Sequence, residues 1–364
     1  MTLAAANLWA PALRRGAPVP YWRYLLGRRA HANAGAGPYA FAHGRTALAV
    51  GLQLLGLRPG DRVLLPDLIC DVVLHPLRDA GLTPVFHPVT ATLAPDWPAV
   101  AALAPGARAL LLVHYFGQPQ DLDQAAAFCA GQGLHLLEDN AHGLGAAWRG
   151  RPLGTWGAVG LCAVHKCLPV ANGGLLYTTA TGPVPTPPLP PLAPWRRLAG
   201  RVAWGLVDAL PPLRRRLRPR PDYSTPGAWH DAPAPAGAMD ETAWQYLQAA
   251  DLAAHAARRR QLYQVWQEWA GEHDLSAVFP ALHPAASPLV FPARTPSAAV
   301  SRQWFDWGWT VGIDVHSWPA LPAEILADAA APALQLWRTM VCFPIHAGMD
   351  PAALRRRLAR TPGP

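Results

Sequence analysis

The chain of 364 residues contains a single lysine, Lys166, beside 30 arginines. Both residue types carry positive charge, but only lysine releases its proton readily enough to act as a nucleophile. A solitary lysine in such a chain is therefore a candidate for attack on a carbonyl group, with formation of a Schiff base. The alternative is a surface lysine left by an arginine-rich composition, and the residues around it must decide between the two.

Short apolar runs alternate with helix-like stretches between residues 41 and 179. This alternation predicts a mostly parallel sheet covered by helices on both faces. Ligands of such sheets bind beyond the carboxyl ends of the strands, so polar residues that directly follow an apolar run are candidates for a site. The expected strands lie at 62–65, 84–86, 109–113, 134–137 and 174–177, and the expected helices at 46–55, 71–80 and 122–132.

Several short motifs follow one another in this region. Residues 44–48 read GRTAL, residues 113–119 read VHYFGQP, residues 138–142 read EDNAH, and Lys166 precedes a Gly173–Gly174 pair. In this order they resemble the pyridoxal-phosphate sugar aminotransferases of the DegT/DnrJ/StrS family, from about residue 41 to residue 360. The resemblance implies an α/β protein of the aspartate-aminotransferase-like fold type I, with a mostly parallel sheet in a large domain and a small C-terminal α/β domain. It also implies pyridoxal 5′-phosphate as the cofactor, held on Lys166.

The resemblance gives Asp139 and His142 roles beside that cofactor. Asp139 would pair with the pyridinium nitrogen and keep it protonated, which makes the ring an electron sink. An aspartate after a strand can instead cap a helix. His142 stands where the family commonly has a glutamine, and it would bond the phenolic oxygen or stack on the ring. The alternative for His142 is a histidine with satisfied hydrogen bonds at a helix start.

The cofactor phosphate needs hydrogen-bond donors, and the resemblance assigns them to Gly44, Arg45 and Thr46. These residues open an expected helix, where free N–H groups and the helix dipole favour an anion. Arg45 replaces a small residue of the family and would pair with the phosphate or face solvent. Two departures imply weaker or different cofactor binding. No aromatic follows strand 62–65, so that Cys70 or Ile69 takes its place, and no serine occurs at 161–165 before the lysine.

Composition excludes several other classes of protein. The net charge of +8 comes almost wholly from residues 194–221, which hold eight arginines and one aspartate, and no nucleic-acid recognition motif accompanies them. The five cysteines are scattered, which supports neither a disulfide framework nor a metal site. No apolar run is long enough to cross a bilayer, and the first thirty residues lack a signal-peptide core, so we expect a cytoplasmic protein.

A Pro- and Arg-rich insertion at 181–238 separates the two expected domains. Its apolar residues Trp195, Leu198, Val202, Leu206 and Leu210 share one helical stripe, with arginines away from it. A basic amphipathic helix with tryptophan can lie in a membrane interface, so 194–221 is a candidate for peripheral membrane contact. The other expectation is packing on its own domain or on a homodimer partner, which the family's matching region supports.

The sequence therefore predicts an N-terminal arm (1–40), a large cofactor-binding domain (41–180), the insertion (181–238), and a long helix with a small C-terminal domain (239–364). In the last part we expect one helix from about 239 through 269, a strand at 310–315, and a cleft-facing segment at 316–319. Most of the tryptophans there are expected in the core or the cleft wall.

The predicted function is that of a pyridoxal-phosphate-dependent aminotransferase. It would act as a homodimer and carry an amino group from an amino-acid donor to a keto sugar, nucleotide-linked, as in the biosynthesis of polysaccharide or antibiotic sugars. One alternative is a non-catalytic or divergent homologue with a binding, regulatory or membrane-associated role. The other is a pyridoxal-phosphate enzyme that modifies sugars without transamination, although such family members typically have histidine in place of the lysine.

Overall fold

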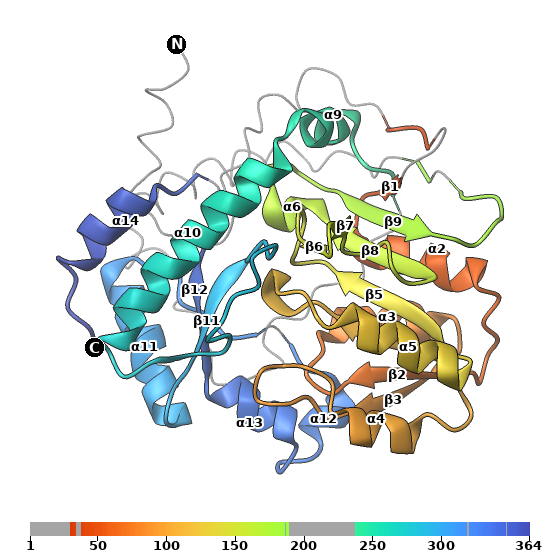
Figure 1. Ribbon diagram of the computed structural model, residues 1–364, viewed down its shortest axis with the longest axis horizontal. Coiled ribbons are helices and arrows are strands. Elements are labelled where there is room, and N and C mark those ends of the chain that lie inside the picture. The colour runs from red at the N-terminus through yellow and green to blue at the C-terminus, as the bar shows by residue number, and fades with distance from the viewer. Residues whose placement is uncertain (1–29, 34–37, 186, 189–236, 319, 347) are drawn as a thin grey trace.

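A computed structural model describes residues 30–33, 38–185, 187–188, 237–318, 320–346 and 348–364 (Figure 1). The expected amphipathic helix at 195–210, and with it the whole arginine-rich segment 194–221, lies outside the described residues. So does most of the expected N-terminal arm. The fold is therefore built here from the two regions on either side of the insertion.

A seven-stranded sheet forms the centre of the larger region, in the order β1-β9-β8-β5-β4-β2-β3. The five strands from β8 to β3 are parallel, and β9 runs antiparallel to both of its neighbours. The mostly parallel sheet expected from the sequence is confirmed. The strands are β1 (Tyr39–Phe41), β2 (Arg62–Pro66), β3 (Thr83–His87), β4 (Ala107–Val113), β5 (His135–Asn140), β8 (Val159–Ala163) and β9 (Gly174–Thr178).

Both faces of this sheet are covered by helices, as the side chains of β4 show. Leu111 and Val113 join a core that includes residues of α2 (Gly44–Leu54) and α3 (Leu74–Asp79). Leu110 and Leu112 point the other way, into a core with α4 (Trp97–Leu103) and α5 (Leu122–Gln132). Because successive side chains of a strand alternate between faces, a strand buried on both sides must be apolar throughout, which explains the continuous run in β4.

The C-terminal region consists of helices packed on a three-stranded antiparallel sheet, β10-β11-β12. Its strands are β10 (Ser276–Ala277), β11 (Val290–Arg294) and β12 (Met340–Pro344), and its helices are α9 (Glu241–Ala249), α10 (Leu252–Gly271), α11 (Ala298–Val311), α12 (Ala323–Leu326), α13 (Pro332–Arg338) and α14 (Pro351–Leu358). A small ribbon, β6 (Ala147–Trp148) with β7 (Arg151–Pro152), lies between β5 and β8 in the sequence, within the larger region.

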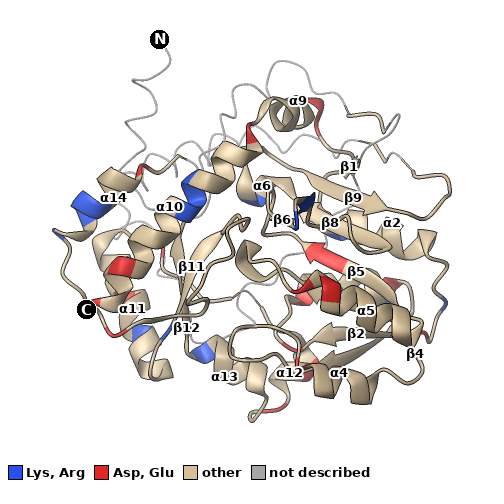
Figure 2. Ribbon diagram, viewed as in Figure 1, with Lys and Arg blue, Asp and Glu red and all other residues tan. Residues whose placement is uncertain are grey.

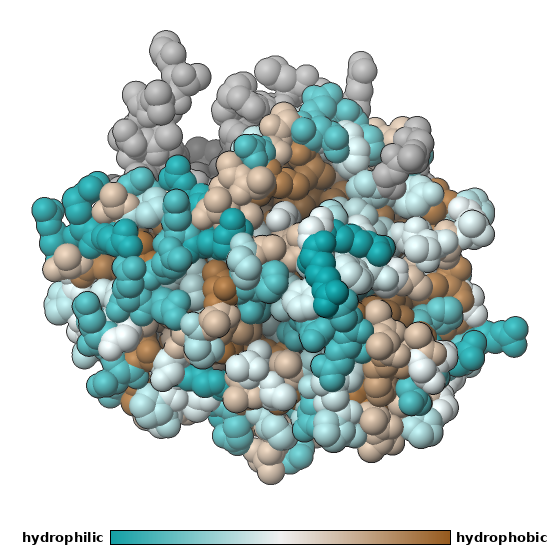
Figure 3. All heavy atoms as spheres, viewed as in Figure 1, coloured by the Kyte–Doolittle hydropathy of each residue, from teal (hydrophilic) through white to brown (hydrophobic). Residues whose placement is uncertain are grey.

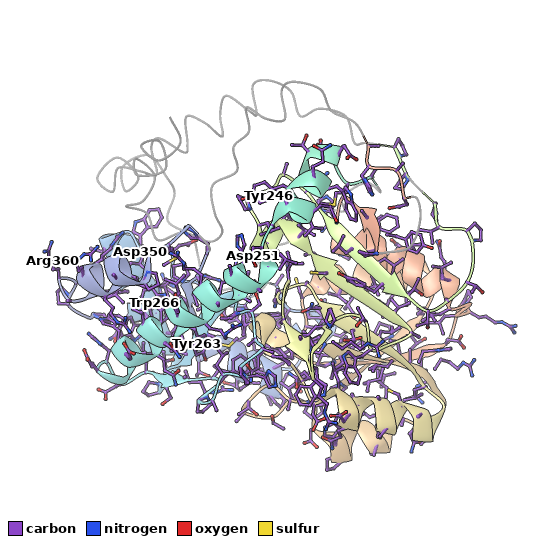
Figure 4. The ribbon with its side chains drawn as sticks, turned by 45° about the horizontal axis from the view of Figure 1, so that its top comes forward. Tyr246, Asp251, Tyr263, Trp266, Asp350 and Arg360 are labelled. Carbon is purple, nitrogen blue, oxygen red and sulfur yellow. The ribbon has the colours of Figure 1, made fainter. Side chains whose placement is uncertain are left out.

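Two expectations for this region are wrong. The single helix expected from about 239 through 269 is two helices, because Ala250 is extended and the Asp251 side chain caps α10 by accepting the N–H of Ala254 (2.9 Å; Figure 4). The strand expected at 310–315 is the end of α11, which runs to Val311 and stops at Gly312 in the left-handed conformation (φ 76°). Glycine adopts that conformation without strain, and the helix therefore ends there.

The core of the C-terminal region is aromatic. Trp266 and Trp269 on α10 contact Phe343 of β12 at ring-centroid distances of 4.8 and 5.8 Å, and Trp269 also stacks on Trp307 of α11 at 5.4 Å. Figure 4 shows Tyr263 and Trp266 along the same stretch of α10. Of the five tryptophans expected mostly in the core or the cleft wall, four are buried, which confirms the expectation, and Trp309 is half-buried; the buried ones are Trp304, Trp307, Trp318 and Trp337.

No helix in the described ranges is both long and apolar enough to span a bilayer. On the face shown in Figure 3, hydrophobic side chains gather beside α9. None of the five cysteines, all of which lie in the described ranges, forms a disulfide, and all except the half-buried Cys70 are buried.

Candidate active site

Two neighbouring parallel strands deliver the candidate catalytic residues to one edge of the sheet. Asp139 is the next-to-last residue of β5 and pairs in register with Leu161 of β8. The short helix α6 (Val164–Cys167) follows β8 directly and carries Lys166. Because parallel strands end at the same edge, residues far apart in the sequence come together there. Figure 2 shows the acidic residues of β5 in red within a largely uncharged sheet.

Asp139 is a buried carboxylate, only 7% exposed. Its Oδ1 accepts the N–H of Ala141 (2.9 Å), so it does form the local bond expected of a cap. Oδ2 has no hydrogen-bond partner among the described residues. Burial raises the pKa of Asp139, while the positive charge of Lys166 acts to lower it. The local bond therefore leaves one oxygen for a cationic partner, and the two roles weighed for this residue are compatible.

Lys166 is half-buried, and its Nζ lies 3.3 Å from Nε2 of His142. Helix α6 is held from the C-terminal region by Arg259 of α10, which is 1% exposed and donates from Nη2 to the carbonyl of Cys167 (2.7 Å). The same guanidinium donates to the carbonyls of Pro288 (3.1 Å) and Ile345 (3.4 Å). A four-residue helix leaves most of its carbonyls unpaired, so this contact fixes the end of α6 next to the lysine.

The ring of His142 sits among aromatic side chains. It stacks on Phe116 (centroids 5.9 Å apart, 14° between planes) and meets Trp318 edge-on (5.2 Å, 75°). Its Nδ1 accepts the N–H of Phe116 (3.2 Å). Burial, and then the charge of Lys166, lower the pKa of His142 well below its usual range, so the ring is neutral. Both ring nitrogens of His142 thus have a partner, Phe116 N–H at Nδ1 and Lys166 Nζ at Nε2.

Glu138, next to Asp139, anchors the strand end. Its carboxylate accepts Nε2–H of His114 (3.2 Å) and the backbone N–H groups of Gly154, Trp156 and Gly157 (2.8, 2.5 and 2.6 Å). Burial raises the pKa of Glu138, but the bonds from His114 and the backbone outweigh it and hold the pKa below its usual value. No role was predicted for this residue, although an acidic residue within a buried strand is a signal of such a network.

The start of α2 lies beside α6, as the phosphate assignment requires. Rings of His43, which precedes Gly44, and His165, which precedes Lys166, are 5.8 Å apart. A Cβ on Gly174 would lie 2.2 Å from the carbonyl carbon of His43, so only glycine lets β9 pass this close to the helix start. Residues 44–46 and Lys166 are therefore brought together.

Arg45 and Thr46 are both half-buried at this helix start. Burial lowers the pKa of His165 to about 4, and the positive charges of Lys166, His43 and Arg45 add to that effect. Arg45 is thus close enough to α6 for its positive charge to act on His165.

The loop after β2 differs from the rest of this edge. Cys70 is half-buried at the start of a 3₁₀ turn (Asp71–Val73), and no aromatic residue lies between Asp67 and Cys70. Asp67 is 6% exposed, its Oδ1 has no hydrogen-bond partner among the residues that the structure describes, and burial raises its pKa to about 6. The aromatic surface next to His142 comes instead from Phe116 and Trp318. Trp318 belongs to segment 316–319, which was expected to face the cleft, and it does contact His142. The contact of Phe116 with His142 was not predicted, because the orientation of Phe116 depends on an unusual backbone angle (φ 53°).

Comparison with known proteins shows what the chain is similar to. Residues 36–181 match the DegT/DnrJ/EryC1/StrS aminotransferase family. A curated relative, the dTDP-4-dehydro-2,3,6-trideoxy-D-glucose 4-aminotransferase of Saccharopolyspora spinosa, is 36% identical over 138 residues, which are 37% of this chain and 36% of the relative. The match thus spans about a third of the length of that relative. The resemblance noted from the motifs is confirmed over this stretch, which is shorter than the 41–360 expected.

Solved structures extend the likeness to most of the chain. The aminotransferase TlmJ from Streptoalloteichus hindustanus superposes with a TM-score of 0.63 over 89% of this chain and 84% of its own, at 22% identity. The E. coli GDP-4-keto-6-deoxy-D-mannose-3-dehydratase with bound hydrated PLP gives 0.62 over 98% and 92%, at 16% identity. At these identities the likeness establishes the fold, and the predicted fold type I architecture is confirmed.

Proposed function

We propose that this chain, whose residues 36–181 match the DegT/DnrJ/EryC1/StrS family, is a pyridoxal-phosphate-dependent aminotransferase acting on a nucleotide-linked keto sugar. The observation that carries the proposal is the position of the sole lysine. Lys166 lies near the buried carboxylate of Asp139 at the carboxyl edge of a sheet of aminotransferase type. The Saccharopolyspora spinosa relative, named as a 4-aminotransferase of a dTDP-linked 4-dehydro sugar, supports the substrate class.

The groups at this edge fit pyridoxal phosphate. They supply an amine on Lys166, an open Oδ2 on the buried Asp139 for a cationic ring nitrogen, and the first N–H groups of α2 at residues 44–46 for the phosphate. The absence of a side chain at Gly174 keeps that helix start clear. When bound, the cofactor supplies a conjugated ring that withdraws electrons from the carbon bearing the amino group.

The residues of this chain then have distinct tasks. Nζ of Lys166 removes and returns the proton of that carbon, since it is the titratable base at the site on a mobile side chain. Asp139 stabilises the positive ring nitrogen. Phe116 and Trp318, which are 4% and 3% exposed, keep water away from His142 and Lys166.

The test is spectroscopic and then chemical. The purified full chain, incubated with pyridoxal phosphate, should gain a visible absorbance band, which glutamate or glutamine as amino donor should remove. A dTDP-linked 4-keto sugar should restore the band, and mass spectrometry should show the ketone replaced by a primary amine. A chain that never binds the cofactor would instead be the non-catalytic homologue considered as an alternative.

A second candidate is removal of a hydroxyl group from the sugar rather than amino transfer. The structural likeness to the E. coli 3-dehydratase favours it. The two candidates differ in the product, because a dehydratase gives a deoxygenated sugar without new nitrogen. The same mass measurement therefore separates them, and the retained lysine favours the aminotransferase.

The proposal includes a cytoplasmic homodimer with domain boundaries near residues 40, 180 and 238, in which 194–221 contributes to the dimer rather than to a membrane. Light scattering of the full chain and of a chain lacking 194–221 tests this assembly. Loss of the dimer supports it. An intact dimer that sediments with anionic vesicles only at low salt would favour the peripheral membrane role.

A further inference from the structure

The buried side of helix α10 carries three side chains that donate hydrogen bonds to backbone carbonyls. Trp266 donates from its indole N–H (3.0 Å) and Tyr263 from its hydroxyl (2.9 Å) to carbonyls of the C-terminal region, and Figure 4 shows both along α10. Arg259 lies one turn before Tyr263, and positions four apart share a face of a helix. Arg259 differs from the other two, because it is charged and also donates to a residue of the larger region, Cys167.

The charge of Arg259 is balanced by carbonyl groups. The side chain is 1% exposed, and no carboxylate pairs with it in the part of the chain that the structure describes. Its hydrogen-bond partners there are the carbonyls of Cys167, Pro288 and Ile345, at 2.7, 3.1 and 3.4 Å. Charge-assisted hydrogen bonds offset part of the cost of burying the ion. The three carbonyls belong to three separate segments, so the planar fork of a guanidinium suits them better than an ammonium or an amide.

One of these bonds acts next to Lys166 in the sequence. Cys167 is the last residue of α6 and directly follows Lys166. The backbone becomes extended at Leu168, so no further helical turn supports this end of α6. The bond from Arg259 supports it instead, from the C-terminal region.

A second bond acts on the neighbour of Lys166 in space. Arg259 binds the middle residue of segment 287–289, whose backbone N–H groups donate to the carbonyls of segment 116–117 (2.8 and 3.1 Å). That segment presents a backbone N–H to Nδ1 of His142 (3.2 Å), and Nε2 of His142 lies 3.3 Å from Nζ of Lys166. Arg259 is therefore connected to the lysine by two separate routes.

We propose that Arg259 is a positioning residue that holds the Lys166 side chain in place from two sides, through the end of α6 and through the backbone segments that support His142. The positioning depends only on the described contacts, and its consequence for catalysis rests on the proposed function. A displacement of a reacting group by about 1 Å can cost about 100-fold in rate. Loss of the guanidinium should therefore slow the chemical step more than it weakens the binding of substrates.

The first test needs no cofactor. Because the chain contains one lysine, labelling lysine with ¹³C at Cε gives one side-chain signal, which reports the surroundings of Lys166 alone. We expect one narrow signal in the full-length parent. In Arg259→Met the signal should move toward that of a solvated lysine or divide into several. Arg259→Gln keeps two N–H donors, should give a smaller change, and carries the test if the methionine variant fails to fold.

The control for this test is Arg258→Gln. Arg258 is an exposed residue of the same helix, and it contacts Met349 and Asp350 instead of α6 or segment 287–289. This variant should leave the lysine signal unchanged. An unchanged signal in an Arg259 variant whose circular dichroism matches the parent would overturn the proposal.

The second test is kinetic and uses the cofactor-loaded chain. In Arg259→Gln, kcat for amino transfer should fall at least about tenfold, while KM for the keto sugar stays within about threefold of the parent. Arg258→Gln should stay within about twofold in both. An unchanged kcat in folded Arg259→Gln would overturn the catalytic consequence. A parent that transfers no amino group would refute the proposed function, and the ¹³C signal would still decide whether Arg259 positions Lys166.

Discussion

The ends of β5 and β2 lie at the same edge of one parallel sheet, but the buried carboxylates there differ in their hydrogen bonding. After β5, the carboxylate of Glu138 has four hydrogen-bond donors, and the residues behind it reach Lys166 through His142. After β2, the buried carboxylate of Asp67 keeps one oxygen without a partner, and no aromatic side chain follows it. In the described part of the chain, the carboxylate near the end of β5 is thus hydrogen-bonded at both oxygens, whereas the carboxylate after β2 is not.

The two loops remain connected, because Tyr115, at the end of β4, donates from its hydroxyl to the carbonyl of Leu68 (2.7 Å) and contacts Trp318 at 5.5 Å. Backbone bonding also joins the β2 loop to the C-terminal region, where Asp71 N–H donates to the Ala320 carbonyl (3.0 Å). Trp318 of the C-terminal region therefore lies beside the site, next to the loop after β2, whose residues 67–70 include no aromatic side chain.

The largest effect is expected on the β5 and β8 side, from Lys166→Arg. The positive charge survives but the nucleophilic amine does not, so amino transfer should fall by at least about 1,000-fold with the fold intact. Turnover and the visible band, measured beside circular dichroism, check this. Near-normal turnover would remove Lys166 from the mechanism. The lack of any other lysine excludes rescue by a neighbour.

Asp139→Asn should reduce turnover by about 100- to 1,000-fold while the chain still binds pyridoxal phosphate. The amide oxygen can keep the bond from Ala141, which preserves the local turn, but a neutral side chain no longer stabilises a cationic ring nitrogen. Turnover and cofactor affinity measured on the same preparation separate the two effects. Unchanged turnover would assign Asp139 to the turn alone.

On the β2 side the expected effect is on stability. The pKa of Asp67 is raised to about 6, so the folded state binds its proton more tightly than the unfolded state, and this contribution is lost as the pH rises through 6. Asp67→Asn should therefore gain about 1.4 kcal/mol in unfolding free energy over the parent between pH 5 and pH 8, because nearly all of the change in this window falls between pH 5 and the folded-state pKa of about 6. Urea unfolding at both pH values measures the difference. Asp79→Asn, at an exposed aspartate, is the control, and an equal gain there would contradict the assignment.

The smallest effect is a gain from restoring an aromatic ring with Cys70→Phe. A stacked ring contributes about 0.5–1.5 kcal/mol, so the affinity for pyridoxal phosphate should rise roughly two- to tenfold, with Cys70→Ala as the control. Titration of the visible band gives both values. Weaker binding than in the alanine variant, at an unchanged melting temperature, would mean that Phe116 and Trp318 already fill the space.

Much of the fold could be predicted because its signals are local. The apolar run of β4 and the motif EDNAH each mark a buried strand and its polar end, and parallel strands place such ends at one edge wherever the chain folds this way. The helix boundaries that failed, at Ala250 and Val311, depend on one capping residue and one left-handed glycine, which weigh little against a continuous helical pattern.

The sequence by itself determined that Lys166 is the only nucleophilic amine of a side chain and that Asp139 and His142 follow a buried strand. Only the tertiary structure decided what surrounds them. The Phe116 N–H donates to Nδ1 of His142, and Arg259 donates to the carbonyl at the end of α6. Trp318 takes a place beside the site that no residue near Cys70 fills. These contacts join residues distant in the sequence, and their geometry depends on backbone angles and packing that no local pattern encodes.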